Sequence, residues 1–189
     1  MEKIRRENNW NIPNALTVLR LLLLPVFAWR YLIGDNSGAL VVYLVVQVSD
    51  LLDGFIARKW RQITSFGKLM DPLADKLMLL TALICFGVRG KLAWWVVTLI
   101  LGKEALMIAG GAFALRKKIV VSARWIGKVA TGLFAAAVIG MLINNEAAVL
   151  GVLPQALLYA AVAVTLAALC TYAHNLLRKL REAKENRSS

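Results

Sequence analysis

Six long apolar stretches constrain this chain more than any other feature of its sequence. They cover residues 16–32, 39–57, 69–88, 92–115, 126–143 and 149–177. Each is close to the roughly 20 residues that an α-helix needs to cross the hydrocarbon core of a membrane. With 59% hydrophobic residues, the 189-residue chain has more apolar surface than a soluble domain of this length can bury. We therefore predict an all-α integral membrane protein, a six-transmembrane-helix bundle forming one domain over residues 1–189.

The basic residues predict how this bundle is oriented. The net charge is +12, and most of the 23 lysines and arginines lie before the first stretch, between the second and third, between the fourth and fifth, and after the last. Short segments rich in lysine and arginine stay on the cytoplasmic side of a membrane. We expect both termini to be cytoplasmic, with residues 1–12 as an interfacial segment that includes a short helix and residues 178–189 as a polar tail. Topology thus accounts for the charge without a nucleic-acid partner.

Four aspartates interrupt the second and third apolar stretches. Asp50 and Asp53 are three residues apart, and Asp71 and Asp75 are four apart, so each pair shares one face of its helix. The segment between the two helices is short and basic, which makes them antiparallel neighbours. Both acidic faces should therefore meet near the cytoplasmic interface, where they form the candidate active site.

Clustered carboxylates need positive charge beside them, because a charged group near the bilayer centre costs about 2.5 kcal/mol or more. Two divalent cations would balance four aspartates, and all-oxygen ligation suits Mg²⁺, Mn²⁺ or Ca²⁺ rather than zinc. The single histidine, His174, is about a hundred residues away. The alternative is ion pairing with Arg58, Lys76 or Lys103.

Arg20, inside the first stretch, has two interpretations that the sequence does not separate. Its side chain can extend to the nearby cytoplasmic interface, as long basic side chains do near helix ends. It can also be the partner of a phosphate or of the carboxylate cluster.

Further basic residues are candidates for binding an anionic acceptor. Lys103 and Glu104 lie inside the fourth stretch, where they form either a mutually satisfied pair or part of a site facing the bundle interior. Arg116, Arg124 and Lys128 belong to a basic segment on the same predicted membrane side as the aspartates. Part of that segment serves topology.

The spacing of these residues resembles a known family signature. The pattern is Asp50-x-x-Asp53-Gly54-x-x-Ala57-Arg58, then eight residues, then Gly67-x-x-x-Asp71-x-x-x-Asp75. It is similar to the signature of the CDP-alcohol phosphotransferases (CDP-alcohol phosphatidyltransferases). Segments 11–20, 71–76 and 125–128 also resemble phosphatidylglycerophosphate synthases of that family.

The resemblance implies a membrane enzyme of phospholipid biosynthesis, usually a homodimer, that transfers the phosphatidyl group of CDP-diacylglycerol to an alcohol and releases CMP. It implies that Asp50, Asp53 and Asp71 hold two divalent ions, Mg²⁺ or Mn²⁺, and that Asp75 completes the metal site and is the catalytic base. It also implies a CDP-binding pocket, whose residues are Asp50, Gly54, Ala57, Arg58 and Gly67.

The acceptor alcohol is less constrained. Phosphatidylglycerophosphate synthases typically carry an Arg-Glu pair where this chain has Lys103-Glu104, and an arginine where it has Gly111. We expect glycerol 3-phosphate as acceptor, bound by Lys103, Arg116, Arg124 and Lys128. The alternative is cardiolipin synthesis with phosphatidylglycerol as acceptor, because 103–109 looks closer to those enzymes. A remote alternative is an ion transporter, which predicts carboxylates spread across the bilayer rather than at one depth.

Overall fold

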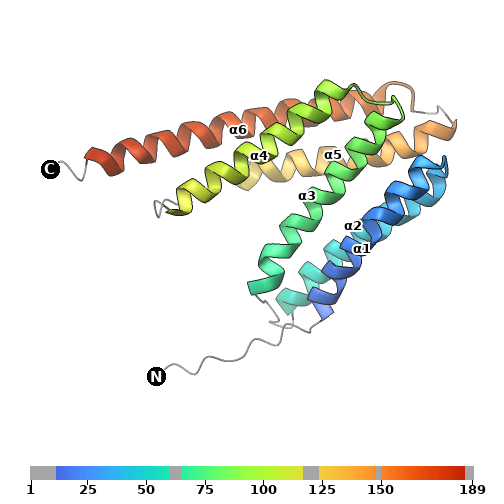
Figure 1. The fold of residues 1–189 in the computed structure, drawn as a ribbon, viewed down its shortest axis with the longest axis horizontal. Coiled ribbons are helices and arrows are strands. Elements are labelled where there is room, and N and C mark those ends of the chain that lie inside the picture. The colour runs from blue at the N-terminus through green and yellow to red at the C-terminus, as the bar shows by residue number, and fades with distance from the viewer. Residues whose placement is uncertain (1–11, 60–64, 117–123, 148–149, 186–189) are drawn as a thin grey trace. The chain divides into compact units, whose positions relative to one another are not determined.

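The structure is a computed structural model and describes residues 12–59, 65–116, 124–147 and 150–185. Within these ranges the chain forms six α-helices, which confirms the all-α prediction (Figure 1). The helices are α1 (Ile12–Leu32), α2 (Asn36–Lys59), α3 (Ser65–Val88), α4 (Trp94–Arg116), α5 (Arg124–Ala147) and α6 (Leu153–Glu185). Each contains most of one predicted apolar stretch. The predicted interfacial segment lies almost entirely outside the described residues.

The described helices differ in how well they suit a membrane. Three segments are long and apolar enough to cross one, by length and composition alone: Asn14–Leu32, Gly127–Asn144 and Leu153–Asn175. Asn36–Leu52 is a shorter apolar helix. These findings fit a membrane protein, while the six-span bundle and its orientation stay predictions.

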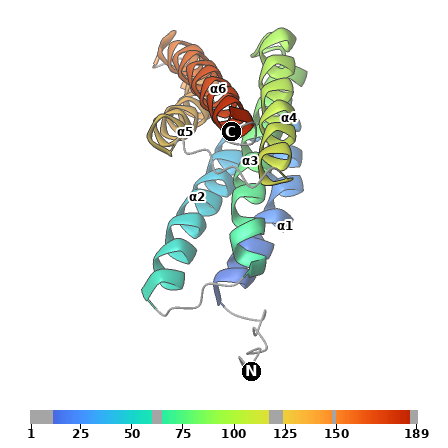
Figure 2. The same cartoon turned by 90° about the vertical axis from the view of Figure 1, so that its left-hand side faces the viewer.

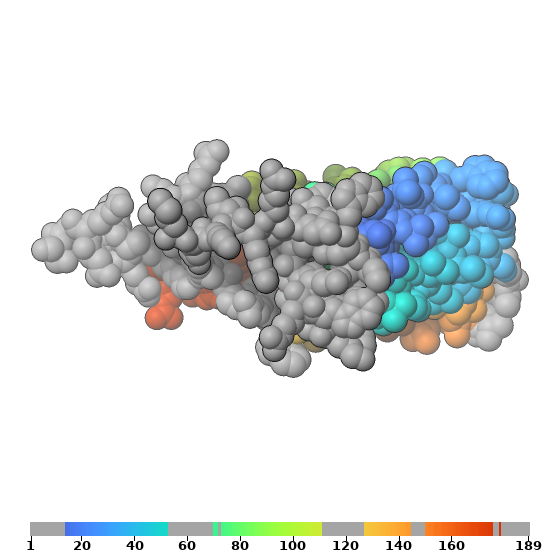
Figure 3. All heavy atoms as spheres, turned by 90° about the horizontal axis from the view of Figure 1, so that it is seen from below, coloured from blue at the N-terminus to red at the C-terminus, as the bar shows by residue number. Residues whose placement is uncertain are grey.

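The first three helices form one compact unit, in which α1 packs against both α2 and α3. Figure 2 shows the three helices of this unit running along one another, and in Figure 3 the described atoms of α1 and α2 lie in direct contact. A tight turn reverses the chain between α1 and α2, and Gly34 adopts a φ of 96° there, a conformation that costs glycine little. Asp35 then caps α2 by accepting a hydrogen bond from the Gly38 N–H at 2.7 Å.

Aromatic side chains hold one end of this unit together. Phe27 and Tyr31 of α1 stack on each other at 6.3 Å, and Tyr31 meets Phe86 of α3 edge-on at 5.1 Å. Arg89 lies over the Tyr31 ring and donates a hydrogen bond to Asn36 Oδ1 at 2.8 Å. Because Tyr31 follows Arg20 by eleven residues, this aromatic end is about 16 Å along α1 from Arg20.

The last three helices, apart from Asn145–Ala147 at the end of α5, form a second compact unit, which we describe separately. α4 packs against α6, with Trp95 stacked on Tyr159 at 6.3 Å. Gly140 of α5 lets Pro154 approach so closely that an added Cβ would be 3.2 Å from the proline ring. α6 continues to Glu185, so the first part of the predicted polar tail is helical, as expected from its lysine, arginine and glutamate residues.

Candidate active site

Arg20 stands at the centre of the candidate site. It lies on the third turn of α1, on the side that faces α2 and α3, and only 1% of the residue is exposed. A buried guanidinium must find acceptors for its N–H groups, because leaving a charge unpaired in an apolar environment is very costly. Its surroundings therefore show which other groups belong to the site.

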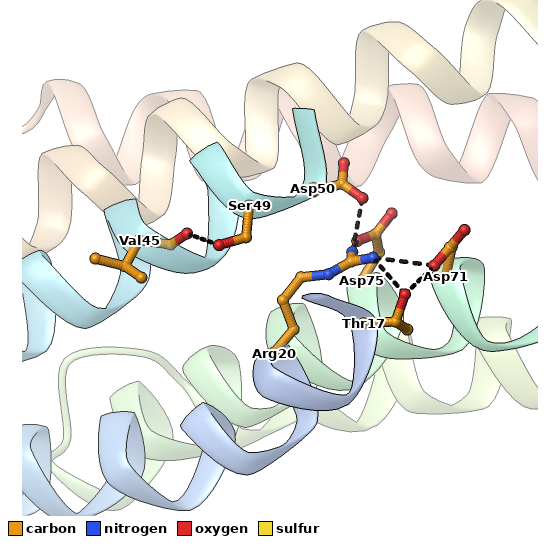
Figure 4. Close-up of polar contacts among 7 residues, drawn as sticks. All are labelled: Thr17, Arg20, Val45, Ser49, Asp50, Asp71 and Asp75. Atoms are coloured by element: carbon orange, nitrogen blue, oxygen red, sulfur yellow. Dashed lines mark hydrogen bonds and ion pairs between the residues drawn. The ribbon is translucent and has the colours of Figure 1, made fainter. Parts of the chain in front are cut away.

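Three aspartates from two helices accept hydrogen bonds from this guanidinium (Figure 4). Nη1 donates to Asp50 Oδ1 of α2 at 2.6 Å and to Asp75 Oδ1 of α3 at 2.8 Å, while Nη2 donates to Asp71 Oδ1 of α3 at 3.1 Å. Residues 30 to 55 positions apart in the sequence thus meet at one side chain. The predicted meeting of the two acidic faces is present for these three carboxylates.

Thr17, one turn before Arg20, adds a second link to the same cluster. Its hydroxyl donates to Asp71 Oδ1 at 2.5 Å, and the residue is fully buried. Asp71 thus accepts hydrogen bonds from two residues of α1. Sequence reasoning missed Thr17, although its position three residues before Arg20, on the same helix face, was an available signal.

The cluster has a closed side and an open side. Arg20 is buried, whereas the side chains of Asp50, Asp71 and Asp75 are 35%, 38% and 43% exposed. In Figure 4 each of these carboxylates turns one oxygen toward the guanidinium and the other away from it. These carboxylates are hydrogen-bonded to Arg20 on one side and exposed on the other, so they are accessible to a cation or to a polar substrate.

Arg20 also decides between two sequence interpretations. Extension of its side chain to the interface is wrong, because the residue is buried and paired with carboxylates. The sequence also left open that Arg58, Lys76 or Lys103, rather than metal ions, form ion pairs with the aspartates. In the described part of the chain, the residue that pairs with three of the four aspartates is Arg20. Lys103 instead pairs with its neighbour Glu104.

The other predicted site residues are placed less completely. Asp53, Gly54, Ala57 and Arg58 belong to the last turns of α2, and Gly67 to the first turn of α3, but their side chains lie outside the described ones. The same holds for Arg116, at the end of α4, and Arg124, at the start of α5. Lys128 is exposed on α5. The predicted acceptor residues thus lie in or at the ends of α4 and α5, in the second unit.

Comparison with known proteins places this arrangement in a family. The sequence profile of the CDP-alcohol phosphatidyltransferases matches residues 10–167, a range that contains α1 to α5 and the whole carboxylate cluster. The chain belongs to the CDP-alcohol phosphatidyltransferase family. The resemblance inferred from the aspartate spacing is thereby confirmed.

Three similar proteins within this family carry three different names. A probable phosphatidylglycerophosphate synthase of Mycobacterium tuberculosis is 34% identical over 184 residues, which cover 94% of this chain and 87% of that protein. A CDP-diacylglycerol--glycerol-3-phosphate 3-phosphatidyltransferase of Cereibacter sphaeroides is 40% identical over 129 residues, 62% of this chain and 58% of that protein. A CMP-forming cardiolipin synthase of Streptomyces coelicolor is 37% identical over 112 residues, 56% and 52% of the two chains.

CDP-alcohol phosphatidyltransferases generally use divalent metal ions, and the carboxylate cluster suits one chemically. Asp50 and Asp75, from different helices, already place oxygens around one positively charged nitrogen, and such oxygens are what hard divalent cations prefer. Among the described residues, however, no three metal-ligating side chains are gathered in a metal-binding arrangement. In the structure the three carboxylates are organised around Arg20.

Proposed function

We propose that this chain transfers the phosphatidyl group of CDP-diacylglycerol to glycerol 3-phosphate, giving phosphatidylglycerophosphate and CMP. The observation that carries the proposal is the meeting of Asp50, Asp71 and Asp75, from two helices, inside the region that matches the family. Relatives named for this reaction support the choice of acceptor. The reaction places the protein in phospholipid biosynthesis.

Within this proposal the aspartates have two roles. Asp50, Asp53, Asp71 and Asp75 hold two divalent ions, Mg²⁺ or Mn²⁺, which stabilise negative charge on the departing CMP when bound. Asp75 takes the proton of the attacking hydroxyl, because its carboxylate is the most exposed of the three described ones and an acceptor must be within reach of the alcohol. The fixed guanidinium of Arg20 keeps that carboxylate in place.

The remaining proposed contacts follow the family signature and the charge pattern. Asp50, Gly54, Ala57, Arg58 and Gly67 form the pocket for the CDP group, with glycine and alanine giving room for a ligand near the backbone. The acceptor phosphate is bound by basic residues of the second unit, namely Lys103, Arg116, Arg124 and Lys128.

The membrane setting is part of the same proposal. A lipid substrate needs its acyl chains in the bilayer and its headgroup at the surface. We therefore place the carboxylate cluster at the cytoplasmic face of a six-span protein with both termini in the cytoplasm, in a cell membrane, and we propose that the chain forms a homodimer. The lysine and arginine pattern between the apolar stretches supports the orientation.

A release assay tests the reaction. The purified full-length protein is incubated with CDP-diacylglycerol, glycerol 3-phosphate and Mg²⁺ or Mn²⁺, and CMP is measured. We expect CMP release that requires the metal and stops with EDTA. Absence of metal-dependent CMP release with any alcohol acceptor would reject the enzyme and favour the ion-transport alternative.

A second candidate function is cardiolipin synthesis with phosphatidylglycerol as acceptor. Two observations favour it: the similarity to a cardiolipin synthase, and a lysine where an arginine is typical, since the lysine ammonium lacks the two-pronged geometry of a guanidinium. Lipid products are analysed after offering glycerol 3-phosphate and phosphatidylglycerol separately. Phosphatidylglycerophosphate from the first supports our proposal, whereas product only from the second replaces it.

A further inference from the structure

We propose that Arg20 is the internal counter-cation of the carboxylate cluster, and that it competes with the divalent ion for the same aspartates. The inference rests on the proposed function, which assigns these aspartates to metal binding. It concerns a residue outside the family signature as read from Asp50 to Asp75. Arg20 acts on the site as a positioning residue, since it holds the carboxylates rather than reacting itself.

The first observation is that the Arg20 guanidinium connects aspartates of two helices. Nη1 is shared by Asp50 and Asp75, one from each acidic helix, and Nη2 binds Asp71. A planar guanidinium with several fixed N–H groups can hold carboxylates from different directions, which a lysine ammonium does less well. One side chain of α1 therefore sets the spacing of the α2 and α3 carboxylates.

The second observation is that Arg20 is buried while its partner carboxylates are exposed. The guanidinium lies on the closed side of the cluster, and each partner carboxylate is more than a third exposed on the other side. A cation from solution can reach these aspartates only from the open side. The Oδ1 atom of each of these carboxylates already accepts a hydrogen bond from Arg20.

The third observation is that the positive charge of Arg20 lies beside the aspartates that would bind a divalent ion. Arg20 compensates part of the negative charge that would otherwise attract a divalent ion, and like charges a few ångströms apart repel strongly even at an effective dielectric constant of about 20. Binding of the ion must therefore weaken the pairing of the aspartates with Arg20. The two cations are alternative ways of stabilising one cluster, so loss of either increases the contribution of the other.

The test compares wild type with Arg20→Gln, both as the full chain in detergent, without substrate. Thermal unfolding is measured in EDTA and in Mn²⁺, and Mn²⁺ binding is measured by electron paramagnetic resonance. We expect Arg20→Gln to have a lower Tm in EDTA, a larger rise of Tm on adding Mn²⁺, and Mn²⁺ binding about tenfold tighter than wild type.

Arg89→Gln is the matched control. Arg89 belongs to the same unit and contacts Asn36 and Tyr31 at the aromatic end, with no aspartate among its described partners. A residue that merely supports the fold should lower Tm equally with and without Mn²⁺. We expect this result for Arg89→Gln, and the same result for Arg20→Gln would overturn the inference.

Arg20→Lys keeps the test decisive if the glutamine variant does not fold. The lysine retains the charge but pairs with fewer carboxylates, so we expect Mn²⁺ binding tighter than wild type by a smaller factor. Mn²⁺ binding that is unchanged or weaker in this variant would overturn the competition. Metal-dependent CMP release by wild type is measured in parallel, because its absence would reject the proposed function, whereas its presence with no gain in Mn²⁺ affinity would reject only the role of Arg20.

Discussion

At the scale of single residues, the aspartates of the site differ in the hydrogen-bond donors of α1 that they contact. Asp50 and Asp75 share Nη1 of Arg20, and Asp71 is bound by both Arg20 and Thr17. Asp71 therefore differs from Asp50 and Asp75 in its hydrogen-bond donors, even though the sequence spacing makes the aspartates look equivalent. This difference predicts different consequences for their substitution.

Asp75→Asn should abolish turnover while leaving CDP-diacylglycerol binding largely intact. The amide has nearly the shape of the carboxylate but does not take up a proton, and loss of a general base typically costs about 100-fold or more in rate. CMP release and binding of CDP-diacylglycerol are measured side by side. Asp35→Asn, in the turn before α2, is the control and should keep its activity, while normal turnover by Asp75→Asn would remove Asp75 from the mechanism.

Thr17→Val should destabilise the protein by about 1 kcal/mol, because it removes the part-buried hydrogen bond from the buried Thr17 to Asp71 without changing the side-chain volume much. Thr98→Val is the matched control, since the Thr98 hydroxyl is exposed and donates a hydrogen bond to the carbonyl of Trp94 in its own helix. Thermal unfolding in detergent compares the two. Equal Tm values for the two variants would contradict a specific role of Thr17.

At the scale of elements, α1 is the helix that joins the first unit. It contacts α2 and α3 along its length, through Arg20 and Thr17 toward one end and through Phe27 and Tyr31 toward the other. The turn between α1 and α2 completes the unit, because Asp35 caps α2 and also pairs with Arg30 of α1. The cap makes the start of α2 sensitive to pH.

The pH dependence of this cap has a definite sign. The Gly38 N–H and then the Arg30 guanidinium lower the pKa of Asp35 below its usual 3.8. A carboxylate whose pKa is lowered by folding contributes stability above its unfolded pKa and loses that contribution as the pH falls through the folded value.

We therefore expect Asp35→Ala to lower Tm at pH 7, and the Tm difference from wild type to shrink as the pH falls below about 3.8. Thermal unfolding at a series of pH values measures it. A Tm difference that stays constant down to the lowest pH would show that ionisation of Asp35 does not stabilise α2.

At the scale of the whole molecule, the described helices fall into two compact units, with the carboxylate cluster in the first and the predicted acceptor residues in the second. The predicted six-span topology places the ends of α2 and α4 and the starts of α3 and α5 on the cytoplasmic side.

Thiol labelling tests this topology. In a background with Cys85 and Cys170 replaced by alanine, Lys91→Cys should react with a membrane-impermeant reagent added outside intact cells. Lys128→Cys should react only after the membrane is opened, because the two exposed positions lie on opposite sides of a six-span bundle. Labelling of both from outside would contradict the orientation.

Sequence reasoning found the helices well and the contacts between them only in part. The apolar stretch at 69–88 predicted most of α3 because period and length are local properties. The faces of Asp50 and of Asp71 and Asp75 were also predictable, since helix geometry fixes which residues share a face. The pairing of Arg20 with these carboxylates was one of two interpretations that the sequence left open, because the choice depends on how α1 rotates against α2 and α3, which no local pattern determines.

The position of Arg20 on α1 also has a consequence for the order of membrane insertion. An isolated helix with an arginine in its apolar part carries an insertion cost of about 2.5 kcal/mol, and the aspartates that offset this charge are synthesised 30 to 55 residues later. In the predicted membrane topology, α1 therefore reaches its final stability only after α2 and α3 have been synthesised.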